Sequence, residues 1–145
     1  MKVTIMMVVH NGEKYIYDCM ESISKQTFSD FELLIVNDGS TDRTREIIHS
    51  FKDSRIKLID NTHDYIDSLN IGLNESKGEY IARIDADDIM LPERIMTQIE
   101  LMENRKEVDV CASWATTFGK RSGTVAIYKH HIHYPIAKLL RANIF

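Results

Sequence analysis

Three aspartates, Asp85, Asp87 and Asp88, occur within four positions, directly after a short apolar run. Asp85 and Asp87 are two residues apart, so an extended backbone would point both carboxylates to the same side, roughly 6–7 Å apart at Cα. Carboxylates this close repel each other unless a cation lies beside them. Hard divalent ions prefer oxygen ligands, so the spacing predicts a Mg²⁺ or Mn²⁺ site with room for phosphate oxygens.

The spacing alone leaves other roles open for this acidic stretch. Aspartate also ends strands and caps helices, and a D-x-D triplet arises by chance in many chains. A calcium-binding EF-hand loop is disfavoured, because the sixth and twelfth positions from Asp85 hold Met90 and Met96 instead of Gly and Glu. A phosphatase-type D-x-D-x-T nucleophile fails as well, because Ile89 occupies the threonine position.

The acidic triplet follows one of several apolar runs that alternate with helical patterns. Strands are predicted at 3–9, 31–36, 56–59, 80–84 and 108–115, and helical stripes at 16–23, 44–51, 66–73 and 95–102. This alternation predicts a mainly parallel sheet with helices on both faces. The composition of 80–84 is typical of a strand buried on both faces, and Pro92 suits the first position of the last of these helices.

Polar residues also follow the first two predicted strands, as His10-Asn11 and Asn37-Asp38. Parallel neighbouring strands would bring them to the same sheet edge as the acidic triplet, where ligands of such folds bind. No G-x-G-x-x-G or Walker loop is present, so an ion held by aspartates would meet the charge of a diphosphate. Asp38 would then bind a nucleobase or ribose, or it would serve only as a turn and helix cap; the spacing leaves both open.

The composition excludes some classes of function. The 145 residues, 43% of them hydrophobic, suit one domain or part of one, and the net charge of −4 predicts no nucleic-acid binding. The run Val3–Val9 is too short for a signal peptide, and no run is long enough to span a membrane. Cys19 and Cys111 lack metal-type spacing, which favours buried free thiols in a reducing, cytoplasmic compartment.

The part after residue 115 carries weaker signals. A polar loop is predicted at 119–123 and a short helix around 136–140. His130, His131 and His133 resemble a metal cluster by spacing, but neighbouring positions face different ways, so a metal role for them is disfavoured.

Four separate motifs occur in an order and spacing that resemble family 2 glycosyltransferases of the GT-A fold. They are TIMMVVHN at 4–11, LIVNDGSTD at 34–42, LNIGL at 69–73 and KGEYIARIDADD at 77–88, continued by LPER at 91–94. The resemblance implies a Rossmann-like α/β fold of the nucleotide-diphospho-sugar transferase type, truncated in its C-terminal part. It implies a donor-binding domain over 1–115 and the incomplete start of an acceptor-side region over 116–145.

The resemblance also implies which residues hold the donor. Asp38 would contact the nucleobase, often uracil in this family, and Val9 and Asn11 would hold the nucleotide at the end of the first strand. The implied partners are a nucleotide-sugar donor and a glycan or lipid-linked acceptor. The sequence departs from the family before Leu69, where a glycine is usual and His63–Ile66 stands instead.

The metal side of the site is implied in the same way. Asp87 would bind Mn²⁺ or Mg²⁺ directly, and Asp85 would lie near the ribose and a metal-bound water. Arg83 matches a variant of the motif and would pair with an aspartate or with the diphosphate; both remain open. The general base is expected beyond residue 145.

The function expected from these residues is a metal-dependent, inverting glycosyl transfer in surface polysaccharide or cell-wall synthesis, with peripheral membrane association of the full-length protein. A non-catalytic nucleotide-binding fragment is the alternative. A nucleotidyltransferase ranks last, because the stretch 11–14 after the first strand is poor in glycine.

Overall fold

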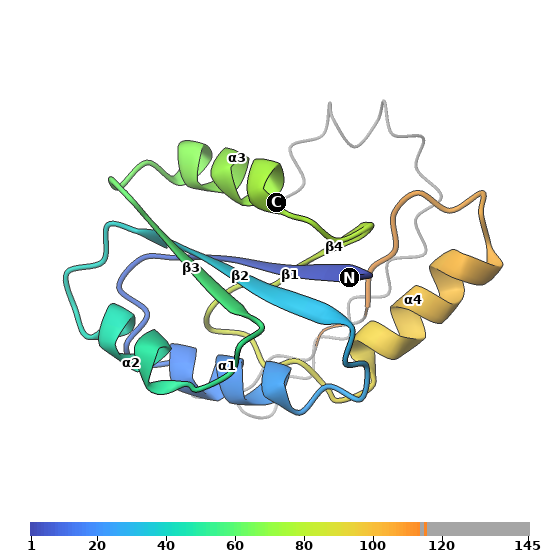
Figure 1. The fold of residues 1–145 in the computed structure, drawn as a ribbon, viewed down its shortest axis with the longest axis horizontal. Helices are drawn as coiled ribbons and strands as arrows, with labels where there is room; N and C mark the ends of the chain where they lie inside the picture. The colour runs from blue at the N-terminus through green and yellow to red at the C-terminus, as the bar shows by residue number, and fades with distance from the viewer. Residues whose placement is uncertain (114, 116–145) are drawn as a thin grey trace.

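The computed structural model describes residues 1–113 and 115 and shows a parallel four-stranded sheet in the order β3-β2-β1-β4 (Figure 1). The elements in chain order are β1 (Val3–Val9), α1 (Ile16–Ser24), β2 (Phe31–Asp38), α2 (Thr44–Ser50), β3 (Ile56–Asn61), α3 (Tyr65–Glu75), β4 (Tyr80–Arg83) and α4 (Arg94–Asn104). All three strand pairs are parallel, which confirms the predicted α/β class.

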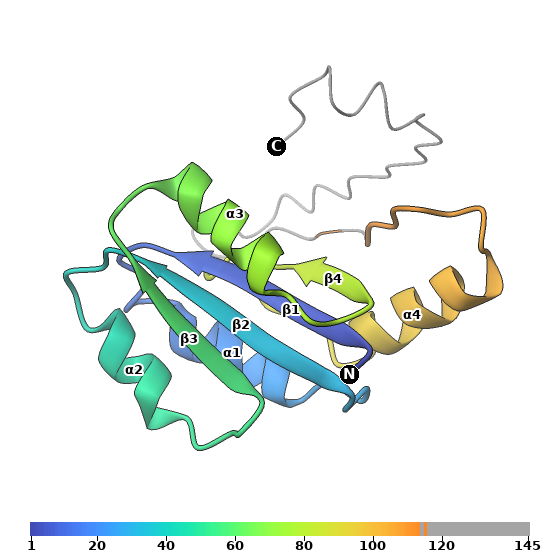
Figure 2. The same cartoon turned by 45° about the horizontal axis from the view of Figure 1, so that its top comes forward.

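Helices cover both faces of this sheet, as predicted. Figure 2 shows α3 on one face and α1 with α2 on the other. Alternate β1 residues, such as Ile5 and Met7, pack into one core cluster with Ile16 of α1, Ile48 of α2 and Ile95 of α4. β2 lies between two strands, and all eight of its residues are buried. The main core therefore lies on one side of the sheet, where β1 and β2 pack against α1, α2 and α4.

Helix α3 approaches the opposite face with small residues. Ser68 and Gly72 are its buried residues, whereas Ile66 and Leu73 are 65% and 51% exposed. A Cβ at Gly72 would come within 2.7 Å of the Met6 sulfur, so a larger residue there would require the Met6 side chain to move. The apolar stripe predicted the helix correctly but did not indicate the face that it buries.

Strand β4 is more exposed than its composition predicts. In the described part of the chain it pairs only with β1, and the side chain of Ile81 is 44% exposed. The ladder contact continues to Ile84, whose N–H donates to the Met6 carbonyl over 3.1 Å. The prediction of a strand buried on both faces was wrong, because the alternate residues Ile81 and Arg83 point to an exposed face of β4.

The predicted fifth strand is absent over 108–113 of the described chain. The N–H of Val108 donates to the Arg105 carbonyl over 2.9 Å in a turn after α4, and Val110 is 67% exposed. This prediction was wrong, because apolar residues form a strand only where a neighbouring strand accepts their hydrogen bonds. Trp114, the predicted loop and helix at 119–123 and 136–140, and the region 116–145 lie outside the described residues.

Helix α4 begins at Arg94, two residues later than Pro92 predicts. A tertiary contact explains the shift. The Gln26 amide donates to the Leu91 carbonyl over 2.7 Å and accepts the Ile95 N–H over 3.2 Å. This side chain thereby holds 91–93 as a turn and supplies an acceptor to the first turn of α4. None of the helices in the described residues is long and apolar enough to cross a membrane.

A buried polar cluster ties β4 to the sheet at the amino ends of the strands. The Thr4 hydroxyl donates to Glu32 Oε1 over 2.7 Å and accepts the N–H groups of Lys77 and Gly78 over 3.1 and 2.9 Å. Thr4 is fully buried. The Gly78 N–H thus depends on the Thr4 hydroxyl, whereas the Lys77 N–H also donates to Glu32 Oε1 over 3.0 Å.

Thr4→Val is therefore expected to lower the free energy of unfolding by about 1–3 kcal/mol, because the Gly78 N–H loses its acceptor inside the protein. Urea denaturation measures the change, and Thr97→Val on the exposed side of α4 is the matched control. Equal effects of the two substitutions would show that the Thr4 cluster does not stabilise the fold.

Candidate functional site

The carboxyl ends of three neighbouring parallel strands lie along one edge of the sheet. β1 ends at Val9, which pairs in register with Asn37, and β2 ends one residue later at Asp38. β4 ends at Arg83, opposite Met6, so the acidic turn follows it beside the last part of β1. The structure thus brings the predicted site segments to one edge, where ligands bind in this class of fold.

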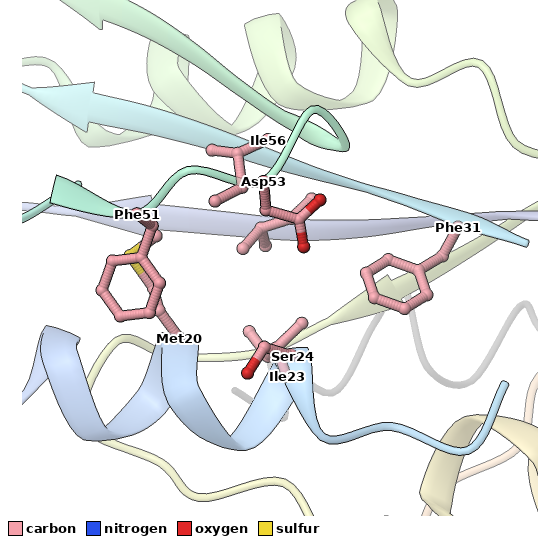
Figure 3. A pocket seen from close by; sticks show the side chains of 8 residues that line it. Met20, Ile23, Ser24, Phe31, Phe51, Asp53 and Ile56 are labelled. Carbon is pink, nitrogen blue, oxygen red and sulfur yellow. The ribbon is translucent and has the colours of Figure 1, made fainter. Parts of the chain in front are cut away.

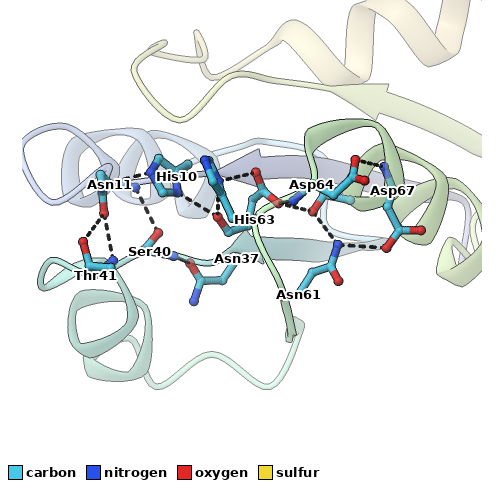
Figure 4. Close-up of polar contacts among 11 residues, drawn as sticks. His10, Asn11, Asn37, Ser40, Thr41, Asn61, His63, Asp64 and Asp67 are labelled. Carbon is cyan, nitrogen blue, oxygen red and sulfur yellow. Dashed lines mark hydrogen bonds and ion pairs between the residues drawn. The ribbon is translucent and has the colours of Figure 1, made fainter.

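Asn11 joins the loop after β1 to the loop after β2 (Figure 4). Its Oδ1 accepts the Thr41 N–H over 2.8 Å, and its own N–H donates to Ser40 Oγ over 3.0 Å. Its φ of 51° is left-handed, a conformation that asparagine tolerates better than most residues. Asn11 is exposed, while Val9 is 3% exposed. Val9 therefore supports the edge from within, and Asn11 lies at its surface with its amide oxygen and nitrogen in contact with Thr41 and His10.

The loop after β1 does not offer free backbone donors for a phosphate. The N–H groups of Asn11, Gly12 and Glu13 donate to side-chain oxygens of Ser40, Thr44 and Asp42, at 3.0, 2.8 and 3.0 Å. A phosphate cradle needs such groups unoccupied. The geometry agrees with the absence of a glycine-rich motif in the sequence.

Asp38 is buried, with 1% of its side chain exposed, and its carboxylate is fixed by α3. Oδ1 accepts the Asp64 N–H over 2.8 Å and the Ser68 hydroxyl over 2.7 Å. At the start of α2, by contrast, it is Asp42 that accepts the Thr44 N–H. The capping alternative for Asp38 therefore does not hold at α2, and Oδ2 is the carboxylate oxygen that neither Asp64 nor Ser68 contacts.

Two histidines that the sequence did not assign to the site lie against Asp38. The rings of His10 and His63 stack with centroids 4.1 Å apart and planes 28° apart. His10 Nδ1 lies 2.7 Å from the Asp38 carbonyl oxygen, and His63 Nδ1 lies 3.3 Å from Asp38 Oδ2. His10 stands in a strand-end motif, but no local pattern marks His63.

The acidic turn is closed by a backbone hydrogen bond, and its three carboxylate side chains are exposed to solvent. The Asp88 N–H donates to the Asp85 carbonyl over 3.1 Å, and Asp85, Asp87 and Asp88 are all exposed. Arg83 pairs with Asp85 over 2.7 Å, and it also donates to the Tyr65 hydroxyl over 3.0 Å. Of the two roles considered for Arg83, the structure shows the pair with an aspartate.

Negative charge accumulates at this turn. Partial burial, and then the carboxylates of Asp85 and Asp87, raise the pKa of Asp88. Burial raises the pKa of the Cys19 thiol to about 12, and the same three aspartates add to that effect. Concentrated carboxylate oxygens suit a hard divalent cation. The three carboxylates do not converge on one point in the described residues, so phosphate or water oxygens would have to complete the coordination.

Asp88→Asn is expected to stabilise the metal-free protein at neutral pH. A raised pKa in the folded state means that the folded protein binds protons more readily than the unfolded chain, so stability falls as the pH rises. The gain in melting temperature should vanish as the pH falls below the ordinary carboxyl pKa of 3.8. Thermal melts of Asp88→Asn and of the control Glu100→Gln test this, and a gain that does not change with pH would contradict the electrostatic cause.

A second hollow lies away from this edge, between the end of α1 and the starts of β2 and β3 (Figure 3). It has room for only about 10 Å³ and is lined mainly by apolar side chains, including Met20, Phe31 and Phe51. Asp53 at its rim is paired with Arg55 over 2.7 Å, which lowers the pKa of Asp53. This hollow offers no group for chemistry, so the carboxyl edge remains the candidate site.

The parallel sheet with an acidic turn at its carboxyl edge is the arrangement of a GT-A glycosyltransferase domain, and the solved structures that this fold resembles are glycosyltransferases of that type. The chain belongs to glycosyl transferase family 2, whose family model matches residues 4–144. It spans about a third to just under a half of the length of the curated relatives that it matches.

Both described cysteines are free thiols, Cys19 buried and Cys111 half-buried.

Three similar proteins illustrate the family. The UDP-Glc:alpha-D-GlcNAc-diphosphoundecaprenol beta-1,3-glucosyltransferase WfaP of Escherichia coli is 39% identical over 106 residues, which are 72% of this chain and 42% of that protein. The structure of S. aureus TarS 1–349 in complex with UDP aligns with a TM-score of 0.69 and 26% identity, covering 73% of this chain and 33% of that one. The mannosyltransferase PcManGT of Pyrobaculum calidifontis, in complex with GDP-Man and Mn²⁺, aligns with a TM-score of 0.55 and 25% identity, covering 61% and 28%.

Proposed function

We propose that this chain is the donor-binding part of an inverting, metal-dependent glycosyltransferase that uses a UDP-sugar. The acceptor is a glycan or a lipid-linked glycan in surface polysaccharide or cell-wall synthesis. The observation that carries the proposal is the placement of Asn11, Asp38 and the acidic turn at one carboxyl edge of a parallel sheet. The UDP-Glc in the name of the WfaP relative and the UDP in the TarS complex support a uridine donor.

The nucleobase would bind at Asp38, with Val9 and Asn11 beside the nucleotide. Asp64 and Ser68 occupy Oδ1, so Oδ2 is the oxygen that would accept an N–H of the base. His63 lies 3.3 Å from Oδ2, and its side chain is 68% exposed. The base would therefore turn this imidazole outward when it binds.

The diphosphate would bind at the acidic turn, where Asp87 and Asp85 would hold Mn²⁺ or Mg²⁺. A divalent ion there neutralises the charge of a departing diphosphate. The Mn²⁺ in the PcManGT complex supports this assignment. Arg83 would balance the Asp85 carboxylate and lies close enough to the turn to contact the diphosphate. We assign the role of general base to none of the described residues.

Asp38→Asn tests the nucleobase contact without removing its scaffold. Asparagine keeps an Oδ1 for Asp64 and Ser68 but places an NH₂ group where Oδ2 would accept the base. The affinity for UDP is expected to fall about 10- to 100-fold, the cost of one hydrogen bond to a charged acceptor, with little change in melting temperature. Calorimetric titration measures the affinity, with Asp67→Asn on the surface of α3 as control. An unchanged affinity would remove Asp38 from the site.

A non-catalytic nucleotide-binding fragment is the second candidate. A donor-turnover assay separates the two. Metal-dependent release of UDP from a UDP-sugar, above the background of an Asp87→Asn sample, would argue for catalysis, and UDP binding without release would argue for the fragment. The free thiols support a cytoplasmic setting, at the membrane face if the acceptor is lipid-linked.

A further inference from the structure

We propose that His10, Asp38 and His63 form a second cation site, separate from the acidic turn, that takes a late first-row divalent ion such as Zn²⁺ or Co²⁺. One potential ligand atom of each residue lies within 4.8 Å of the other two, and no other set of three histidine, cysteine or carboxylate residues meets this condition in the described part of the chain. The three residues come from the ends of β1 and β2 and from the loop before α3 (Figure 4).

The carboxylate of this set is already oriented. Asp38 is 1% exposed, and two donors on α3 and its cap hold Oδ1 at 2.7 and 2.8 Å. Oδ2 has no such donor from the backbone. His63 Nδ1 lies 3.3 Å from Oδ2 and 3.2 Å from the Asp38 carbonyl oxygen, and both oxygens accept, so Nδ1 carries the proton and Nε2 is the nitrogen of His63 that could bind an ion. A metal ligand held by a supporting hydrogen bond loses little freedom when it binds, which favours binding.

His10 is held by a contact that leaves one ring nitrogen with a lone pair. Its Nδ1 lies 2.7 Å from the Asp38 carbonyl oxygen, and a carbonyl only accepts, so Nδ1 carries the proton. Nε2 then has the lone pair, toward which the Asn11 amide nitrogen points at 3.0 Å. An N–H to a backbone carbonyl on one ring nitrogen, with the metal on the other, is the usual arrangement of a metal-binding histidine. An ion at Nε2 would take the place of the Asn11 amide, which contacts this nitrogen in the structure.

The backbone brings His63 over Asp38 at some conformational cost. His63 has a left-handed φ of 23°, which is uncommon outside glycine. Gly39, with a φ of 67°, leaves the space, because a Cβ there would lie 2.9 Å from both Cβ and N of His63. Such strain persists where the surrounding structure fixes it, often at ligand sites.

The ligand set selects the class of ion. Two imidazoles with one carboxylate suit zinc, cobalt or nickel, whereas a site of carboxylates alone suits magnesium or manganese. The stacked rings must rotate to converge on an ion, and the exposed side chain of His63 is free to do so. The inference does not rest on the proposed function, although a bound ion would occupy the oxygen proposed for the base.

The test is Co²⁺ binding to the tag-free 145-residue chain, followed by visible absorption and calorimetry without nucleotide. His130, His131 and His133 are replaced by Gln in every sample, so that they cannot supply the signal. We expect one equivalent of Co²⁺, displaced by Zn²⁺, and an affinity at least tenfold lower in His10→Gln and in His63→Gln. His49→Gln, at the exposed end of α2, should bind as the parent does. Parent-like binding in His10→Gln and His63→Gln, or no binding in the parent, would overturn the proposal.

Nucleotide competition separates this inference from the proposed function. UDP should weaken Co²⁺ binding if the base uses Asp38, because both need Oδ2. If Co²⁺ binds with the histidine dependence described and UDP has no effect, the cation site stands and the base assignment fails.

Discussion

Replacing Asp87 by asparagine should abolish the effect of Mn²⁺ on UDP binding. In the parent chain we expect Mn²⁺ to raise the UDP affinity about 100-fold, because an ion between carboxylate and diphosphate replaces repulsion by attraction. In Asp87→Asn the affinities with and without Mn²⁺ should be nearly equal. Calorimetric titration of UDP at constant ionic strength gives both values. Asp87 is exposed, so the substitution should leave the fold intact.

Two further variants sharpen this prediction. Asp18→Asn, which removes one exposed carboxylate of α1 outside the site, should keep the full Mn²⁺ effect. Asp85→Asn should lose only part of it, because Asp85 already pairs with Arg83. If Asp87→Asn retains the parent's Mn²⁺ dependence, the acidic turn is not the diphosphate site.

The largest expected effect on stability comes from Gly78→Ala. A Cβ at this position would lie 2.3 Å from the Thr4 nitrogen and 2.5 Å from the Val3 carbonyl carbon. Both atoms belong to the backbone of β1, so the clash cannot be relieved by a side-chain rotation. We expect a loss of about 3 kcal/mol or more in the free energy of unfolding, a large share of the stability of a small domain.

Urea denaturation of Gly78→Ala and of its neighbour Lys77→Ala measures this effect. Lys77 is exposed, and its contacts to Thr4 and Glu32 use the backbone N–H, which alanine retains. Lys77→Ala should therefore stay close to the parent. A Gly78→Ala protein as stable as Lys77→Ala would mean that β4 does not lie as close to β1 as described.

The sequence predicted the strands that pair within the described sheet and failed where tertiary context decides. The apolar runs at 3–9 and 31–36 mark β1 and β2 because both strands are covered on two faces. The run at 108–115 has a similar composition, but in the described residues it meets no neighbouring strand. The start of α4 predicted from Pro92 was two residues too early, because the side chain of Gln26, far away in sequence, holds the preceding residues in a turn.

The candidate site was predictable in its carboxylates and not in its supporting contacts. Asp38, Asp85 and Asp87 stand in motifs at strand ends, so topology alone brings them to one edge. The contact of His63 with Asp38 depends on a left-handed loop and on Gly39, 24 positions before it in the chain. No periodicity encodes such a contact. For the same reason, nothing in the sequence distinguished Ser68 from other helix residues, although its hydroxyl donates to the Asp38 carboxylate.

A crystal structure of the chain with Mn²⁺ and UDP tests the central claim most directly. The account predicts manganese bound to the Asp87 carboxylate and to diphosphate oxygens, with the uracil against Asp38 and the His63 ring displaced from it. Manganese and UDP bound elsewhere, with the side chains of Asp85 and Asp87 in bulk solvent, would contradict the account.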